Sequence, residues 1–496
     1  MPGIYGMAGV VIDEGPGDWQ IIQQINGEAS IRLAGAYAKR DIPDDSNVNV
    51  IVRLVSEDSG EPVKQWQQAR LLSEEEWTST QDDNGFSSRQ RGFESRETPS
   101  GYWETIIEGI PAGGLYRIET MLASREYNMD VVITRGDMIH HIGIGDIYLI
   151  AGQSNASGRG KDPVMDPPEI GVHMFRNSGD WSLATHPLNE STRSIYPLHY
   201  EYHNPSHSPY LNFAKQLKRE LGYPIGLIQS ALGGMPLRFW DVEEEGELYH
   251  NMIQLARDAA GGRIRGVLWY QGCTDALEQR SDDYLERFGS MVERTRAELG
   301  LPELPFLTVQ LNRCTRQSDP EMDMHWGRIR EAQRKASRSL PEVYVVPATD
   351  CMLYDLIHNS AAANMMLGER LARMALTELY DRGKWNGVPD IEQALLLQDD
   401  GRIALVFANV HNRFHLFDLP PASVPFTIED EAGRNDIAVW FAEDNRIYLT
   451  PSRPVIGHCV VHGVWQMNPP GPTPTDWGRL PILSFYGVEV QQGTHS

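Results

Sequence analysis

The spacing of apolar and polar residues divides the chain into three stretches. The first, up to about residue 145, contains short runs in which apolar and polar residues alternate, such as VNVIVRLVS and YWETIIEGI, separated by Gly, Pro, Asp and Ser clusters. Alternation with a period of two is typical of strands that bury one face. Since long helical periodicity is absent, we predict an N-terminal β-sandwich-like domain over residues 1–145.

The middle stretch has short, nearly continuous apolar runs that alternate with amphipathic segments. This pattern is typical of a parallel sheet covered by helices on both faces. The predicted strands cover residues 146–151, 225–231, 266–271, 306–311 and 343–348. The predicted helices between them include residues 210–221, 283–299 and 359–380. We therefore expect an α/β domain over residues 146–384.

After about residue 385 the helical signal fades, and strand-like runs such as RIALVFA and RIYLT return. A Pro-rich segment near the end, MNPPGPTPTDWGRLP, predicts a loop, because proline donates no hydrogen bond to a strand ladder. The sequence therefore predicts a C-terminal β-rich domain over residues 385–496.

Composition and charge narrow the range of partners. The 496 residues are 41% hydrophobic and 23% charged, which suits a folded protein with several cores. The formal net charge of -24 repels phosphate backbones and anionic lipids, so we expect neither nucleic acid nor membrane as a partner. The first residues do not resemble a secretory signal, which predicts a cytoplasmic protein, or a secreted or periplasmic one if a signal was removed. The oligomeric state stays open, with a homodimer as one alternative.

Metal sites and disulfides are not predicted. The cysteines are too few and too scattered for a disulfide framework or a zinc site: Cys273, Cys314, Cys351 and Cys459. His203 and His207 have a metal-like spacing, but the intervening Asn-Pro pair opposes a helix that presents both on one face. We expect reduced thiols, no metal and no cofactor.

Residues suited to catalysis follow the predicted strands, where ligands of open parallel sheets bind. The first strand runs into AGQSNASGRG, where Ser154 lies in a turn expected to open a helix, near free backbone N–H groups. A serine nucleophile needs a base, normally a histidine held in one tautomer by a carboxylate. Asp355 and His358 supply both, since a three-residue offset lets the carboxylate meet one ring nitrogen while the other faces Ser154.

Acyl transfer also requires hydrogen-bond donors for the oxyanion of the tetrahedral intermediate. The Gly-Gly turn in GGMPLRFW offers the unobstructed backbone N–H of Gly234, and the strand-end WYQG offers the side-chain amide of Gln271. The N–H of Ser154 is the third candidate for this oxyanion hole.

These segments occur in an order that resembles the sialate O-acetylesterase branch of the SGNH hydrolases. The resemblance rests on GDIYLIAGQSN, GGMPLRFW, WYQG and DLIH, and extends to WGRIREAQ and the closing NPP…GRLPILSF. It implies a three-layer αβα, flavodoxin-like catalytic domain flanked by β-rich domains. It also implies a cofactor-free serine carboxylic-ester hydrolase that removes acetyl groups from sugars. By position, the family's nucleophile corresponds to Ser154, its oxyanion-hole residues to Gly234 and Gln271, and its D-x-x-H pair to Asp355 and His358.

One residue departs from the family pattern. Such proteins usually carry an acidic residue after the Gln-Gly of WYQG, where this chain has Cys273. The departure puts a substrate contact or a loop-anchoring role of that acid in doubt, but not the serine mechanism.

Candidate substrate-binding residues lie close in sequence to Ser154 and the Gly-Gly turn: Gln153, Asn155, Arg159, Arg238 and Trp240. The two guanidinium groups suit a carboxylate such as that of sialic acid, and the alternative is that both are salt-bridged scaffold. Trp240 could stack on a sugar together with Trp269 and Tyr270, or belong to the core.

The favoured function is a carbohydrate O-acetylesterase that acts on sialate. An esterase for plant or bacterial polysaccharide, of the xylan or xyloglucan type, is the alternative of the same chemistry. The alternatives of other classes are a catalytically silent carbohydrate-binding protein and a thiol hydrolase that uses Cys273 or Cys351.

Overall fold

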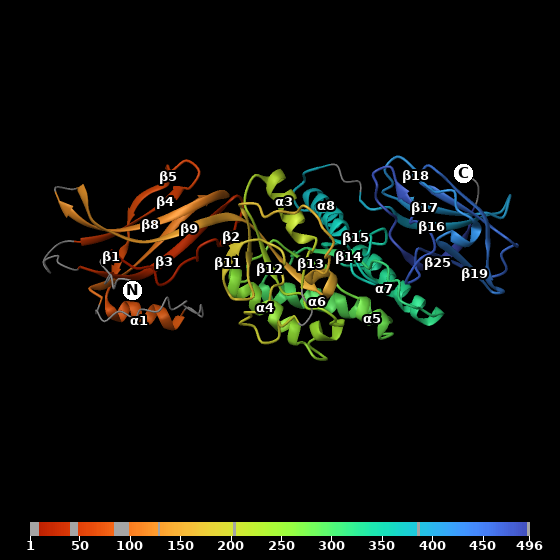
Figure 1. The fold of residues 1–496 in the computed structure, drawn as a ribbon, viewed down its shortest axis with the longest axis horizontal. Helices are drawn as coiled ribbons and strands as arrows, with labels where there is room; N and C mark the ends of the chain where they lie inside the picture. The colour runs from red at the N-terminus through yellow and green to blue at the C-terminus, as the bar shows by residue number, and fades with distance from the viewer. Residues whose placement is uncertain are drawn as a thin grey trace.

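The computed structural model describes residues 9–39, 48–83, 99–126, 129–201, 205–383 and 387–493. In chain order, a β-rich region, a region that combines strands with most of the helices, and a second β-rich region follow one another along the long axis (Figure 1). The predicted order of β-rich, mixed and β-rich stretches is confirmed. The domain boundaries at 145 and 384 stay predictions, because residue 145 lies inside a continuous strand and residue 384 lies outside the described residues.

Two sheets form the N-terminal region. Its elements are β1 (Gly9–Val10), β2 (Ile21–Gln23), β3 (Glu28–Ala38), β4 (Val48–Ser56), β5 (Pro62–Gln68), β6 (Arg70–Leu72), α1 (Glu74–Asp83), β7 (Gly101–Pro111) and β8 (Gly113–Glu126). One sheet has the strand order β1-β3-β7-β6, and the other pairs β5 with β4, β4 with β8, and β8 with β9. Buried residues of both sheets, such as Leu33, Val50 and Trp103, form one hydrophobic cluster.

The sequence pattern did not predict α1. Its N-terminus is a capping box, in which the Glu76 N–H donates to Ser73 Oγ (3.2 Å) and the Ser73 N–H donates to Glu76 Oε2 (2.8 Å). The S-x-x-E spacing could therefore have predicted the start of this helix, which a search for alternating strand residues does not find.

Strand β9 (Met129–Gly152) connects the first two regions. From Met129 to Ile144 it pairs antiparallel with β8. From Asp146 onward it pairs in parallel with β12 on one side and β13 on the other. The segment that follows Gly152 is therefore anchored at the end of a strand near the middle of the largest sheet.

The central sheet has the strand order β11-β10-β12-β9-β13-β14-β15, and β11 is antiparallel to β10. Besides β9, its strands are β10 (Val172–Phe175), β11 (Trp181–Leu183), β12 (Ile225–Gln229), β13 (Gly266–Tyr270), β14 (Phe306–Gln310) and β15 (Val343–Pro347). The five predicted strands are confirmed, whereas β10 and β11 were not predicted. Both are short, and strand-like runs of three or four residues carry little periodicity.

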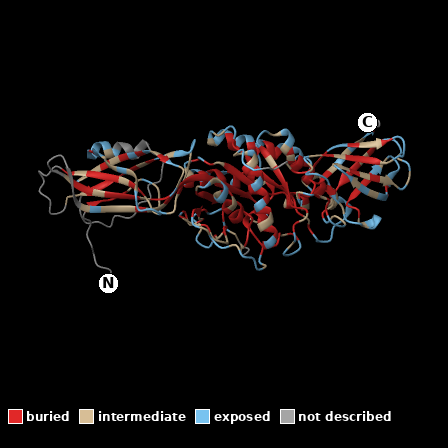
Figure 2. Ribbon diagram, turned by 90° about the horizontal axis from the view of Figure 1, so that it is seen from above, coloured by how far each residue is buried: buried red, intermediate tan, exposed pale blue. Residues whose placement is uncertain are grey.

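The helices of this region are α2 (Ser154–Ser157), α3 (Tyr210–Leu221), α4 (Glu247–Ala260), α5 (Cys273–Leu277), α6 (Tyr284–Leu299), α7 (Pro320–Ser339) and α8 (Ala361–Glu378). The three predicted helices are confirmed as α3, α6 and α8. In Figure 1, α3 and α8 lie on one side of the strands, and α4 and α6 on the other. Buried residues concentrate in this central part (Figure 2), where they form the largest hydrophobic cluster.

The C-terminal region contains β16 (Asp390–Leu397), β17 (Ile403–Ala408), β18 (Phe414–His415), β19 (Phe426–Asp430), β20 (Gly433–Asn435), β21 (Ile437–Glu443), β22 (Arg446–Pro451), β23 (Cys459–Gly463), β24 (Thr475–Asp476) and β25 (Phe485–Gly493). Eight of these strands form one sheet in the order β20-β19-β23-β25-β16-β17-β22-β21. The Pro-rich segment is loop, as predicted, apart from the two residues of β24.

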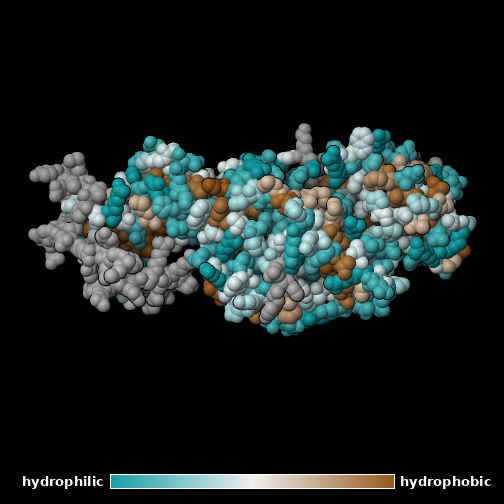
Figure 3. Space-filling view, viewed as in Figure 1, coloured by the Kyte–Doolittle hydropathy of each residue, from teal (hydrophilic) through white to brown (hydrophobic). Residues whose placement is uncertain are grey.

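Buried Arg330 of α7 attaches this last region to the centre. Its guanidinium donates to the backbone oxygens of Val464 (2.8 Å) and Gln466 (2.7 Å). The face of the molecule in Figure 3 is mostly hydrophilic, with small scattered hydrophobic areas. Among the described residues, no helix has the length and apolar character needed to cross a membrane.

Candidate active site

Ser154, His358 and Asp355 form a hydrogen-bonded chain. His358 Nε2 lies 2.8 Å from Ser154 Oγ, and His358 Nδ1 lies 2.7 Å from Asp355 Oδ2. Ser154 is the first residue of α2, just after β9, while the Asp355–His358 loop lies between β15 and α8. With a proton on Nδ1, the ring donates to the carboxylate, and Nε2 is left to accept the serine proton.

The Asp355 carboxylate also shapes the loop that carries it. Its Oδ1 accepts hydrogen bonds from the backbone N–H groups of Ile357 (2.9 Å) and His358 (2.8 Å). Such a turn is the local reason for the D-x-x-H spacing, because the same carboxylate binds the backbone with one oxygen and the imidazole with the other. Ser360 then caps α8 by accepting from the Ala363 N–H (3.1 Å), which ends the loop.

The surroundings keep the imidazole neutral at pH 7. Burial lowers the pKa of His358 below its ordinary value, and this effect outweighs the hydrogen bond that the ring donates to Asp355, which raises the pKa. Burial alone would raise the pKa of Asp355, but the hydrogen bonds from His358 and from the backbone lower it. A neutral base therefore faces the hydroxyl, beside an ionised carboxylate.

Asn155 holds the loop rather than a substrate. It is 3% exposed, its Oδ1 accepts from the Asn359 N–H (3.0 Å), and its Nδ2 donates to the Ile357 oxygen (3.3 Å). Asn312, after β14, donates to the same Ile357 oxygen (2.8 Å). The substrate-binding role predicted for Asn155 does not fit this arrangement, because both ends of its amide are engaged on either side of His358.

Gln153 is also turned toward the protein. It is buried, and its Oε1 accepts from the backbone N–H groups of Gly272 (3.0 Å) and Thr274 (3.4 Å). The side chain before the serine therefore anchors the turn that follows β13. These contacts give Gln153 a structural role beside the substrate contact predicted for it.

Gly234 and Gln271, the two residues predicted to join Ser154 in the oxyanion hole, differ in what they offer. Gly234 has φ 77°, and a Cβ built on it would meet nothing within 4 Å. No described residue accepts a hydrogen bond from its N–H or from that of Ser154. Gln271 is fully buried, and its Nε2 donates to the Met235 oxygen (3.2 Å) and to Asp275. Since both amide hydrogens are engaged, Gln271 is not available as an oxyanion donor in this arrangement.

The two predicted carboxylate-binding arginines are scaffold, which is the alternative that the sequence left open. Nη2 of Arg159 lies 2.7 Å from Oε2 of buried Glu201, close enough for an ion pair although not aligned as a hydrogen bond. Arg238 lies between Glu245 (2.7 Å) and Glu278 (2.5 Å). Both guanidinium groups are thus paired with glutamates of the protein itself.

The aromatic residues predicted as a sugar-stacking wall belong to the core. Trp240 is 1% exposed and packs edge-on against Trp269, with ring centroids 5.3 Å apart. Tyr270 is fully buried, and its hydroxyl accepts a hydrogen bond from Asn359 (3.4 Å). A sugar ring cannot reach these faces without unpacking the sheet.

The thiol alternative is not supported, because the four cysteines are free and buried. Burial raises the pKa of Cys351 to about 12 and that of Cys273 far above its ordinary value. A thiolate nucleophile at neutral pH requires the opposite shift.

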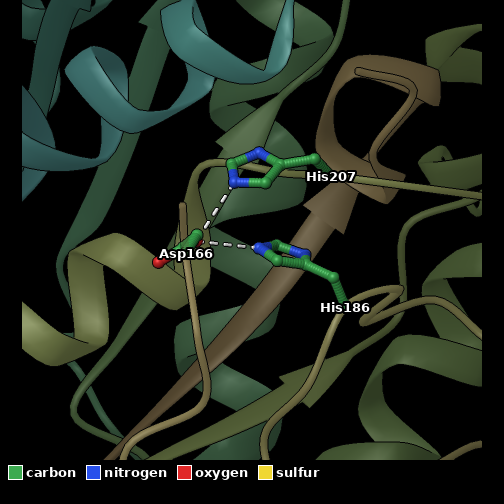
Figure 4. A group of neighbouring side chains, drawn as sticks. All are labelled: Asp166, His186 and His207. Carbon is green, nitrogen blue, oxygen red and sulfur yellow. Dashed lines mark hydrogen bonds and ion pairs between the residues drawn. The ribbon is translucent and has the colours of Figure 1, made fainter. Parts of the chain in front are cut away.

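Asp166, His186 and His207 converge in a second cluster of side chains (Figure 4). Asp166 Oδ2 lies 3.0 Å from Nε2 of His186 and 3.1 Å from Nε2 of His207, and its other oxygen binds the Lys215 ammonium. The three possible ligand atoms lie within 4.8 Å of one another. His203, which the sequence paired with His207, lies outside the described residues.

We interpret this cluster as a hydrogen-bonded brace rather than a metal site. The Lys215 ammonium already balances the charge of Asp166, so a buried divalent ion would stand next to a like charge. Nδ1 of both rings also lacks a partner among the described residues, whereas metal-bound imidazoles normally donate through that nitrogen.

Comparison with known proteins agrees with the geometry. Residues 144–377 match the family described as carbohydrate esterase, sialic acid-specific acetylesterase. A probable carbohydrate esterase of Arabidopsis thaliana is 30% identical over 255 residues, which cover 47% of this chain and 90% of that protein. The chain belongs to this carbohydrate esterase family. It is accordingly an ester hydrolase.

Two more distant relatives of this carbohydrate esterase extend the comparison. Human sialate O-acetylesterase is 19% identical over 227 residues, and the match spans 42% of that protein. A carbohydrate acetylesterase from Xanthomonas citri has the same overall fold, with a TM-score of 0.62 at 19% identity, over 96% of this chain and 99% of that one. The likeness to the latter includes the β-rich regions that flank the site.

Proposed function

We propose that this esterase removes O-acetyl groups from a sugar by a serine acyl-enzyme mechanism in an SGNH-type, three-layer αβα region. The observation that carries the proposal is the 2.8 Å contact between Ser154 Oγ and His358 Nε2, with Asp355 on the far side of the ring. A hydroxyl, a neutral base and a carboxylate in this order are what a serine nucleophile needs.

In the first half of the reaction, His358 takes the Ser154 proton while Oγ attacks the acetyl carbonyl carbon. The carbonyl oxygen becomes an oxyanion, for which the N–H groups of Ser154 and Gly234 are the donors that no described residue engages. As the tetrahedral intermediate collapses, the protonated imidazole returns the proton to the sugar oxygen, and the deacetylated sugar leaves.

In the second half, His358 takes a proton from water, and the resulting hydroxide attacks the acetyl-serine. Collapse of the second intermediate releases acetate and returns the proton to Ser154 Oγ. Asp355 keeps the imidazole oriented in both halves.

The substrate proposed first is acetylated sialic acid, because the family is described as specific for it. Acetylated neutral polysaccharide, of the xylan or xyloglucan type, is the second candidate, because both arginines predicted to meet a carboxylate are paired with glutamates. An acidic sugar would instead meet Arg316, an exposed cation whose charge acts on His358.

The test is acetate release from a panel of acetylated sialic acids, xylan fragments and cell-wall sugars, with wild type and Ser154→Ala side by side. We expect wild type to release acetate from one class and Ser154→Ala to be reduced at least about 10³-fold. Equal activity of the two proteins would refute the serine mechanism, and equal inactivity on every ester would favour a binding protein.

A further inference from the structure

The backbone turn that carries Gly234 is held at both ends by buried carboxylates. At its start, the Gly233 N–H donates to Glu201 Oε2 (3.0 Å). At its end, the Leu237 N–H lies 3.1 Å from each carboxylate oxygen of Asp275. Both ends of the turn between β12 and Trp240 are thus fixed by side chains from other parts of the chain.

Two further contacts fix the middle of the same turn. Thr274 Oγ1 donates to the Gly234 oxygen (3.2 Å), and Gln271 Nε2 donates to the Met235 oxygen (3.2 Å). With both of these carbonyl groups engaged, the peptide planes around Gly234 have little freedom to rotate. The Gly234 N–H itself has no acceptor among the described residues. The turn is therefore held in place while this donor stays available.

Glu201 links this turn to the nucleophile helix. Its side chain is 2% exposed, forms the ion pair with Arg159, and accepts from Ser157 Oγ (3.3 Å) at the end of α2. A Cβ added to Gly233 would lie 2.5 Å from Arg159 Nη2 and 3.0 Å from Glu201 Oε1, so the turn rests directly on the ion pair. A shift of Glu201 would therefore move the turn relative to Ser154.

Asp275, on α5, has a comparable position at the other end of the turn. It is fully buried, and it also accepts a hydrogen bond from Gln271 Nε2. Asp275 thus holds Gln271, which in turn holds Met235, and the same carboxylate binds Leu237 directly. The sequence analysis noted Cys273 as a departure from the family pattern, but it did not consider Asp275 two positions later.

We propose that Glu201 and Asp275 are positioning residues that clamp the turn so that the Gly234 N–H points at the developing oxyanion. The inference rests on the proposed serine mechanism and deepens it. An oxyanion donor is effective only if it already points at the position of the oxyanion before the reaction begins. Loss of one such donor lowers kcat about 10²–10³-fold. A misaimed donor should affect kcat far more than KM, because the ground-state ester gains little from it.

The decisive experiment separates the hydrogen bond to the turn from the ion pair. In both Arg159→Met/Glu201→Gln and Arg159→Met/Glu201→Met the buried charges are gone, but only glutamine can still accept from the Gly233 N–H. With 4-nitrophenyl acetate, we expect the methionine variant to have a kcat roughly tenfold or more below that of the glutamine variant, with KM within about threefold. Its affinity for methylboronic acid, which forms a tetrahedral adduct with the serine, should fall in parallel.

Asp275→Asn and Asp275→Leu form the matching pair at the other end, since only asparagine can accept from the Leu237 N–H. We again expect the leucine variant to be slower in kcat and weaker in boronate binding. Glu278→Gln is the control: this carboxylate pairs with Arg238 beside the turn but does not bind the turn backbone, and its loss should leave kcat unchanged. Circular dichroism and thermal melting establish that each variant is folded.

The inference is overturned if folded Gln and Met variants at position 201 have the same kcat and the same boronate affinity, because Glu201 then serves only as the partner of Arg159. Failure of the proposed function looks different: Ser154→Ala would keep wild-type activity. Inactive Ser154→Ala together with equal Gln and Met variants would leave the serine mechanism standing and remove the clamp alone.

Discussion

His358 Nε2 lies 2.8 Å from Ser154 Oγ, although 204 positions separate the two residues in the chain. Ser154 follows β9, whereas His358 follows β15, and β13 and β14 lie between these strands in the sheet. The loop after β15 spans that gap because Asn155 and Asn312 both hold the Ile357 oxygen. The contact therefore depends on the loop that carries the base as much as on the two residues that react.

The acid limb of the pH profile should reflect the lowered pKa of His358. Since burial lowers this pKa below the ordinary 6.5, the neutral and active form persists to a more acidic pH than that of a free imidazole. Activity is then lost as the pH falls through the lowered pKa and the ring is protonated. The measurement is kcat/KM for a neutral acetyl ester between pH 4 and pH 9. A midpoint above 6.5, or a rate that does not fall on acidification, would contradict the assignment.

Asp355→Asn should lower kcat roughly 10³–10⁴-fold, as loss of the third member of a serine triad does. An asparagine oxygen can still accept from the N–H groups of Ile357 and His358, so the turn should survive while the imidazole loses its anionic partner. Steady-state kinetics and thermal melting measured together check this. A folded variant with more than a tenth of wild-type kcat would show that the carboxylate is dispensable.

Asn155→Ala distinguishes a loop-holding role from a substrate-binding one. Without its two hydrogen bonds, the His358 loop is free to shift, and a displacement of about 1 Å can cost about 10²-fold in rate. We expect a fall in kcat of roughly 10- to 100-fold, with KM for a small acetyl ester within about threefold. A rise in KM at constant kcat would instead restore the substrate contact predicted from the sequence.

The sequence identified the residues whose surroundings are local and missed those whose partners are distant. Ser154 follows a recognisable strand, and Asp355 lies three residues from the ring that it holds, so both could be found from the order of residues. The roles predicted for Gln271 and Arg159 did not fit, because Gln271 donates to Asp275 and Arg159 forms an ion pair with Glu201. Nothing in the order of residues indicates that Glu201 accepts a hydrogen bond from the N–H of Gly233, 32 positions away.

The same limit applies to the fold. The continuous apolar run of β13 and the helical period of α3 were both clear, and these elements were predicted close to their observed bounds. The short strands β10 and β11 are stabilised by their neighbours in the sheet rather than by their own pattern, so they could not be predicted. Trp240 likewise follows a Gly-Pro-rich turn that suggests a surface, and only the packing of Trp269 against it reveals a core position.

Asp166→Asn should destabilise the protein, because it leaves the Lys215 ammonium buried without a counter-charge. Breaking a buried ion pair from one side costs about 3–5 kcal/mol, whereas the control Glu169→Gln, at a more exposed pair with Lys218, should cost about 1 kcal/mol or less. Urea unfolding at pH 7 measures both changes.

The pH dependence of the same contribution has a definite sign. Burial alone would raise the pKa of Asp166, but hydrogen bonds from His186, His207 and Lys215 outweigh it and lower that pKa well below its ordinary 3.8. The stabilisation is therefore complete above the unfolded-state pKa and is lost as the pH falls through the lower folded-state value. The gap in unfolding free energy between wild type and Asp166→Asn should thus be constant near neutrality and shrink below about pH 4. A gap that widened on acidification would mean that folding raises the pKa of Asp166 instead of lowering it.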